Sequence, residues 1–176
     1  MSRRHDTADR PHGAPGLPRN GIRVREATER DLPVVVELRL ALLDEHRRNL
    51  IYRRVRHDLR ERARELYLAQ LRSPREITFL AERDGEVVGI LRCVESSGYP
   101  ILLPPQYGYI SSAYVRSTAR RAGVLTALMN AAIDWCRERG LSEIRLHSTV
   151  ENDTANSAWD ALGFEVVEHL RIRLLT

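Results

Sequence analysis

The sequence contains no lysine: all 28 basic residues are arginine, and 24 Asp plus Glu leave a formal net charge of +4. It has only two cysteines, Cys93 and Cys136, without the CxxC spacing of a zinc or redox site. No stretch approaches the roughly 20 apolar residues that span a membrane, and no apolar run follows Arg3 and Arg4 as an export signal requires. These absences predict a soluble, reduced cytoplasmic protein that uses no metal and has no membrane partner.

What the sequence does contain is enough apolar material for a core. A chain of 176 residues with 43% hydrophobic residues predicts one compact domain and excludes disorder as the main state. Residues 1–20 are rich in Arg, Pro and Gly and predict a disordered tail, which carries +2 of the net charge and leaves +2 for the domain at 21–176. With aromatic residues at only 6%, this small charge argues against a nucleic-acid partner.

The order of the expected elements defines the fold class. Asp84-Gly85 is a strong hairpin signal, and Thr28 with Asp31 resembles a helix cap. We expect strands at 22–25, 77–82, 86–95, 107–115 and 144–150, helices at 32–43, within 49–71, at 125–140 and at 154–162, and one or two closing strands in 164–175. This order predicts an α/β (mixed α+β) fold with a central twisted mixed sheet of six to seven strands and helices on both faces.

An arginine-rich stretch lies in the second expected helix. Eight arginines lie between Arg47 and Arg64, against Asp58 and Glu61. We interpret the stretch as a solvated helix face. The alternatives are an anion-recognising wall beside a substrate pocket and a helix that follows RNA phosphates.

The most informative segment is 114–125, YVRSTARRAGVL, which joins an expected strand to an expected helix. A basic turn with a glycine at a helix N-terminus offers unpaired backbone N–H groups and a partial positive charge to an anion. The segment is therefore a candidate phosphate cradle, although a glycine at this place is often only structural. It is not a Walker loop, because that loop needs a lysine.

Together with segment 150–164, this turn resembles the GNAT superfamily of acyl-CoA-dependent N-acetyltransferases. Arg120, Gly123 and Leu125 occupy the marked positions of the family's first motif. The second motif is matched at Asn152, Ala155, Gly163 and Phe164. The element order agrees from Ile22 onward, so the resemblance covers all but the tail and implies a GNAT-like fold with acetyl-CoA as co-substrate.

The resemblance also implies where coenzyme A would lie. The backbone of residues 113–115 would pair with the pantetheine arm, the amides of residues 121–126 would hold the pyrophosphate, and Asn152 would contact pantetheine or acceptor. The implied set is Ala113, Tyr114, Val115, Arg120, Arg121, Ala122, Gly123, Val124, Leu125, Thr126, Asn152 and Trp159. Family members often pair through sheet edges or C-terminal strands, which makes a homodimer an expectation.

Three departures from the family pattern concern the chemistry. Leu125 stands where the family prefers Gly or Ala, and Trp159 stands where many members have a tyrosine that protonates the leaving thiolate. An indole has no proton that titrates near neutral pH, so Trp159 cannot be that acid. The strand at 107–115 also lacks the carboxylate with which relatives deprotonate the amine. The remaining candidates for acid or base are Tyr114, Tyr109, Ser111, Ser112 and Glu45, with His46 and His147 as further bases.

The expected activity is transfer of an acetyl group from acetyl-CoA to a primary amine of a small molecule or peptide, by direct attack in a ternary complex. Neither cysteine lies in the implied acetyl site, so no acetyl-cysteine is expected. The alternatives are a catalytically weak acyl-CoA-binding sensor and an Arg-rich RNA-binding protein.

Overall fold

The computed structural model describes residues 21–175; the tail expected at 1–20 lies outside this range. The strands are β1 (Ile22–Glu26), β2 (Glu76–Arg83), β3 (Glu86–Ser97), β4 (Gln106–Val115) and β5 (Ile144–Leu146). The α-helices are α1 (Leu32–Glu45), α2 (Leu59–Leu71), α3 (Val124–Glu138) and α4 (Asp153–Ala161), and two short 3-10 helices are η2 (Glu29–Asp31) and η3 (Ser117–Ala119).

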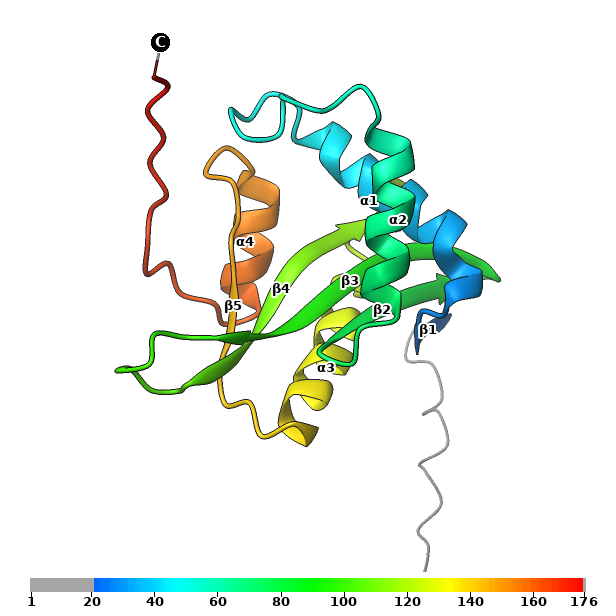
Figure 1. Ribbon diagram of the computed structural model, residues 1–176. Coiled ribbons are helices and arrows are strands. Elements are labelled where there is room, and N and C mark those ends of the chain that lie inside the picture. Colours follow the sequence, from blue (N-terminus) through cyan, green and yellow to red (C-terminus); the bar gives the residue numbers. More distant parts are fainter. Residues whose placement is uncertain (1–20, 176) are drawn as a thin grey trace, which may run out of the picture.

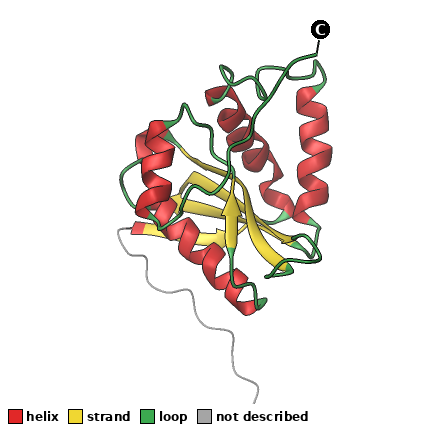
Figure 2. Cartoon of the chain, turned by 90° about the vertical axis from the view of Figure 1, so that its left-hand side faces the viewer, coloured by secondary structure: helices red, strands yellow, loops and turns green. Residues whose placement is uncertain are grey.

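One mixed sheet organises the fold, in the order β1-β2-β3-β4-β5 (Figures 1 and 2). Strands β1 to β4 are antiparallel neighbours, and β5 runs parallel to β4. Helices α1 and α2 cover one face of the sheet and α3 covers the other (Figure 1). The mixed α/β class with helices on both faces is confirmed.

Local sequence signals explain the elements that form as expected. Asp84 and Gly85 both adopt positive φ, 53° and 81°, which is what a two-residue turn between twisted strands requires. The Thr28 amide donates to Asp31 Oδ2 at 2.7 Å, so these two residues cap the chain where it enters η2 and α1.

Apolar side chains on the two faces of the sheet form two clusters. On one face, Leu91 and Cys93 of β3 pack with Leu128, Met129 and Cys136 of α3. On the other, Leu80 and Ile90 pack with Val35, Leu38 and Tyr67 of α1 and α2. Strands β2 and β3 are therefore buried on both faces, which accounts for their nearly continuous apolar sequence.

The strand count of six to seven is wrong: the described residues form five strands. Strand β5 has three residues rather than the expected 144–150, and 164–175 contains no strand. Figure 1 shows this last segment running beside α4 and away from the sheet. Its alternating Leu170, Ile172 and Leu174 suit one face of a strand, yet a strand needs a neighbour for its backbone hydrogen bonds, and none lies beside it in the described chain.

No helix of the described chain combines the length and apolar character that crossing a bilayer requires.

Candidate functional site

Strands β4 and β5 separate from each other part-way along the sheet, and we call this divergence the fork. They pair at only three positions, Gly108–Ile144, Tyr109–Arg145 and Ile110–Leu146. Beyond Ile110, β4 continues to Val115 with β3 as its only strand partner in the described range. The open edge of residues 111–115 exposes backbone hydrogen-bonding groups that an extended ligand can pair with, as an added strand does.

A β-bulge lies at the apex of the fork. The β3–β4 register shifts between Arg92 and Cys93, which leaves Ser111 as the extra residue of β4. Arg92 is held by a salt bridge to Glu76, in which each side chain is only 12% exposed, and it donates to Ser111 Oγ at 2.5 Å. The expected candidate Ser111 is therefore engaged. The neighbouring Ser112 Oγ is buried without a hydrogen-bond partner among residues 21–175, so its full hydrogen-bonding capacity is unused.

The turn after β4 has the geometry of an anion cradle. Arg121 and Gly123 adopt left-handed φ values of 61° and 82°, and Gly123 is the N-cap of α3. The Ala127 amide donates to the Gly123 carbonyl. Between Arg120 and Ala127, no backbone amide donates to another backbone group of the described chain. Six consecutive N–H groups, from Arg121 to Thr126, thus meet no protein acceptor at the positive end of a 15-residue helix.

Two expected site residues from distant parts of the chain form an ion pair beside this turn. Arg120 donates to Glu45 Oε1 at 2.5 Å and to the Val115 carbonyl at 3.0 Å. Its guanidinium lies 5.9 Å from the centre of the Tyr114 ring. The carboxylate of Glu45, the last residue of α1, is thereby occupied, and Arg120 ties α1 to the turn that begins α3.

At the closed end of the fork, Tyr109 and His147 are hydrogen-bonded across the two strands. The Tyr109 hydroxyl and His147 Nδ1 are 2.7 Å apart, and the rings meet edge to face at 5.6 Å. Burial, followed by the neighbouring phenols of Tyr52 and Tyr107, raises the pKa of Tyr109 above its ordinary value. The other candidate base, His46, packs against Tyr52 with the rings tilted by 42° and their centres 5.6 Å apart.

The second motif supplies a helix start and a packing residue. Asn152 is the N-cap of α4, and its side chain accepts from the Ala155 amide at 3.0 Å. Trp159 meets Phe164 edge to face at 5.6 Å, and both pack against the α3 side of the core. Leu125 also packs against that cluster, as its spacing with Met129 indicates.

Sequence reasoning missed Arg92 and Glu76, which hold the bulge. A signal was present, because Arg92 interrupts the apolar run Ile90-Leu91-Arg92-Cys93-Val94 in a strand that is otherwise buried. A charge at such a position requires a partner.

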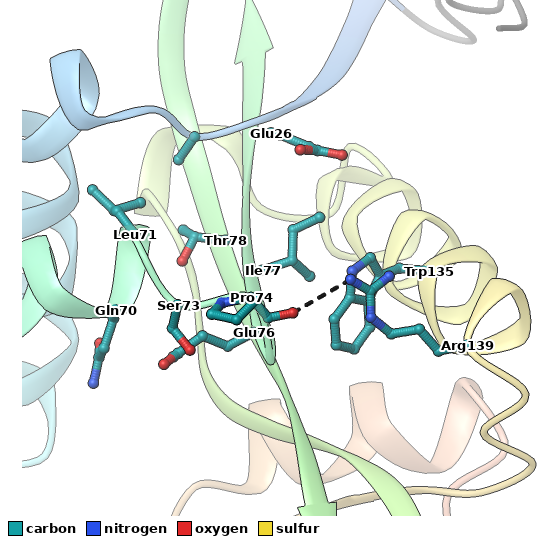
Figure 3. A pocket seen from close by; sticks show the side chains of 11 residues that line it. Glu26, Gln70, Leu71, Ser73, Pro74, Glu76, Ile77, Thr78, Trp135 and Arg139 are labelled. Atoms are coloured by element: carbon teal, nitrogen blue, oxygen red, sulfur yellow. Dashed lines mark hydrogen bonds between the residues drawn. The ribbon is translucent and has the colours of Figure 1, made fainter.

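A separate cavity lies between the end of α2, the start of β2 and the end of α3 (Figure 3). It measures about 250 Å³, and Arg139 donates across it to the Pro74 carbonyl at 3.5 Å. None of the expected site residues lines it. The site described above is an open fork and turn, not this cavity.

The family model described as "Acetyltransferase (GNAT) family" matches residues 38–164, well over half of the chain and the whole of the fork and turn. The chain belongs to the GNAT family. This confirms the resemblance, and the family's enzymes are acetyl-CoA-dependent N-acetyltransferases.

Among curated relatives, the aminoglycoside N(6')-acetyltransferase type 1 of Klebsiella aerogenes is 28% identical over 107 residues, covering 61% of this GNAT chain and 70% of that protein. The N-alpha-acetyltransferase 30 of Schizosaccharomyces pombe is 30% identical over 89 residues, or 51% and 57% of the two chains. The matched region is 22% of the GCN5-related N-acetyltransferase 6 of Arabidopsis thaliana. The matches thus span between 22% and 70% of the length of these relatives.

Solved structures share the fold. The aminoglycoside N-acetyltransferase AAC(6')-Iy in complex with CoA superposes with a TM-score of 0.71 at 21% identity, over 88% of this chain and 94% of that one. A "predicted acetyltransferase with acetyl-CoA" from Clostridium acetobutylicum gives 0.72 at 17%, over 86% and 96%. Coenzyme A or acetyl-CoA is thus present in both of these neighbours, as the family's co-substrate.

Proposed function

We propose that this GNAT protein transfers an acetyl group from acetyl-CoA to a primary amine of a small molecule or peptide. The observation that carries the proposal is the continuity of the fork with the α3 turn. An open strand edge at residues 111–115 is followed, after the short helix η3, by six unpaired amides at a helix N-terminus. An extended polar arm that ends in a pyrophosphate fits both parts at once.

Each part of the site has a distinct role in holding acetyl-CoA. The backbone of Ala113, Tyr114 and Val115 would pair with the pantetheine arm, and the amides of residues 121–126 would bind the pyrophosphate. Arg121 forms no ion pair with another described residue, so its charge is available to a phosphate. Arg120 is paired with Glu45. It would bind a phosphate of acetyl-CoA only if its guanidinium contacted both groups or left the Glu45 carboxylate.

The bound thioester supplies an activated acetyl group, and the protein's part is to align the amine with it and to accept a proton. We propose direct attack in a ternary complex. The support is the placement of the thiols: Cys93 and Cys136 are 0% and 1% exposed, with sulfurs 3.7 Å apart in the core between β3 and α3. A thiol in that position cannot reach a thioester in the fork. The same unpaired, buried thiols suit the proposed reducing cytoplasmic setting.

The acceptor is proposed as a primary amine because relatives named for aminoglycoside and N-alpha acetylation act on amines. Three arginines of the arginine-rich stretch favour a solvated helix face over an anion-recognising wall: Arg47, Arg56 and Arg62 pair with aspartates, and their side chains are 72%, 62% and 58% exposed. Such exposed pairs belong to a solvated surface, which also weakens the RNA-binding alternative.

The proposal is tested by thermal-shift titration with acetyl-CoA, followed by thiol release with kanamycin, spermidine and a tetrapeptide with a free N-terminus. We expect acetyl-CoA to raise Tm and at least one amine to release thiol. Gly123→Ala should weaken acetyl-CoA binding about tenfold, because alanine resists the left-handed φ that forms the cradle. Gly85→Ala is the matched control, since Gly85 has nearly the same φ, 81° against 82°, in the distant β2–β3 hairpin. No change in Tm with acetyl-CoA would overturn the proposal.

The second candidate is an acyl-CoA-binding sensor. The packing of Trp159 against Phe164 favours it, because the α4 position that Trp159 occupies carries an indole and no titratable acid. Binding of acetyl-CoA without thiol release from any of the three amines would decide for the sensor.

We also propose a homodimer in which the last segment of each copy pairs with the sheet edge of the other. Val166, Val167, Leu170, Ile172, Leu174 and Leu175 are all exposed, between 43% and 89%, and β5 has an unpaired outer edge within the described chain. If the two copies exchange their last segments, each copy would cover both the exposed apolar side chains and the unpaired edge of β5. Light scattering should give twice the chain mass, and deletion of residues 165–176 should give the monomer; a full-length monomer would contradict the exchange.

A further inference from the structure

We propose that His147, held by Tyr109, is the proton acceptor for the attacking amine, which rests on the proposed function and assigns it a base. The structure brings together these two side chains from β4 and from the residue that follows β5. Their hydrogen bond of 2.7 Å crosses the two strands at the last closed rungs of the fork.

The position of the pair follows from the direction of the proposed ligand. The phosphates would lie at the turn after Val115, at the open end of the fork, so the arm must run back along β4 toward the apex. Its reactive end then reaches the region of Ser111, two residues from Tyr109. His147 is the first residue after the last β4–β5 pair and its side chain is exposed to solvent, so an amine can reach it.

Two other candidate groups near the fork are already occupied. Glu45 is paired with Arg120, and Ser111 Oγ accepts from Arg92. Ser112 is a hydroxyl, which is too weak a base to hold a proton near neutral pH. An imidazole is the group that exchanges a proton in this range, which makes His147 the suitable acceptor.

Tyr109 gives His147 its orientation. When the Nδ1 proton is donated to the Tyr109 oxygen, the lone pair of Nε2 stays available on the far side of the ring. Burial keeps the phenol in its neutral form, with its pKa raised. The groups around the pair are Tyr52 from the α1–α2 connection, Tyr107 from β4, and Arg145 of β5, whose guanidinium stacks on Tyr107 at 4.0 Å.

The chemistry balances without a further reactant. The neutral amine nitrogen attacks the thioester carbonyl and forms the C–N bond, and its extra proton passes to His147 Nε2. The C–S bond then breaks, the thiolate leaves, and the imidazolium returns the proton to the thiolate through solvent. The products are the N-acetyl amine and coenzyme A, with His147 neutral again. His147 is thus a catalytic residue, and Tyr109 is a positioning residue.

The first test measures rate and binding in His147→Gln, with His57→Gln as the matched control because His57 is also exposed. General base catalysis contributes about 10²- to 10⁴-fold, so we expect kcat to fall about 100-fold while acetyl-CoA still raises Tm. In His57→Gln, as in the wild type, kcat/KM should fall at acidic pH. In His147→Gln this fall should be absent. Added imidazole should restore part of the activity of His147→Ala, which a structural role would not allow. Full activity with an unchanged pH profile in His147→Gln would overturn the proposal.

The second test concerns Tyr109→Phe, with Tyr99→Phe as control because Tyr99 is 74% exposed on the β3–β4 loop. Loss of one hydrogen bond should lower kcat about fivefold and leave KM for acetyl-CoA unchanged. ¹⁵N NMR of the imidazole should show the Nδ1-protonated form in the wild type and a mixture in Tyr109→Phe. A wild-type imidazole protonated at Nε2 overturns the dyad even if no amine is accepted. A wild type with the Nδ1 form but without acetyl-CoA binding would instead refute the proposed function.

Discussion

The chain up to Leu141 and the chain after it are built differently. Every buried residue of the described range lies between Ile22 and Leu141. All of them are in β1 to β4 and the three helices that cover them, except Ala119 of η3 and Leu141, which follows α3. Residues 142–175, with β5, α4 and the last segment, contain only half-buried and exposed side chains. The first region has a core on both faces of its sheet. The second region packs one side against that core, and its other side is not covered by further elements of the described chain.

The difference shows where stability and function separate. The fork lies where the two regions meet. One wall of the proposed acetyl-CoA site, β4, therefore belongs to the region with buried side chains, and the other, β5 with α4, belongs to the region without them. Segments with few buried contacts open at lower free energy than the core. Acetyl-CoA in the fork and a second copy at the sheet edge would each cover part of what the second region leaves exposed.

The largest expected contrast is between two leucines. Leu91 is 0% exposed and Leu174 is 43% exposed. Leu91→Ala should lower the free energy of unfolding by about 2–5 kcal/mol through lost burial and a cavity. Leu174→Ala should cost less than about 0.5 kcal/mol at low protein concentration and more at high concentration, where dimers form. Urea unfolding at two protein concentrations measures the loss of stability in both variants. Equal losses for Leu91→Ala and Leu174→Ala at low concentration would contradict the prediction.

A second contrast uses a glycine of the core. A Cβ on Gly108 would lie 2.5 Å from Cys136 Sγ and 3.4 Å from Cys93 Sγ. Gly108→Ala should therefore destabilise the protein by about 1–3 kcal/mol. The double variant Gly108→Ala/Cys136→Ala should recover part of that loss, because the atom in the way is removed. Thermal unfolding of these two variants and of Cys136→Ala alone completes a double-mutant cycle. If the two single losses of stability add up in the double variant, the Cys136 sulfur is not what the added Cβ collides with.

The third contrast concerns acid. Arg25 hydrogen-bonds Asp31 and holds the pKa of its carboxyl down at about 2. A lowered folded-state pKa means stability that is present above about pH 4 and is lost as the pH falls toward 2, here about 1–2 kcal/mol after solvent screening. Unfolding measured from pH 6 to 2 should show this loss in the wild type and not in Asp31→Asn. Asp84→Asn is the control, since that side chain is 90% exposed, and it should retain the loss.

The sequence predicted the first region better than the second for a physical reason. The Asp84-Gly85 turn, the Thr28 cap and the apolar spacing of α3 are local signals that the buried core reinforces. The pattern at 164–175 is equally strand-like, but a strand exists only when another strand pairs with it, and that partner is not encoded in the segment. The same limit applies to the candidate site. Gly123 and Arg120 were predicted from the basic turn and its match to the family's first motif, whereas the Arg120–Glu45 and Tyr109–His147 contacts depend on how distant elements pack.

The smallest expected effect is at Trp159, the largest side chain of the second region. Its ring packs on Phe164 and the α3 side of the core, and an indole cannot give a proton to the thiolate. Trp159→Phe keeps the edge-to-face contact, so it should cost less than about 1.5 kcal/mol and change kcat by less than about twofold. Trp159→Tyr, which places a phenol at the position where the family resemblance implies one, serves as the comparison for an added acid. If Trp159→Phe lowers kcat tenfold or more with Tm and acetyl-CoA binding preserved, the indole N–H takes part in the reaction, and the weakly packed region supplies chemistry as well as a wall of the site.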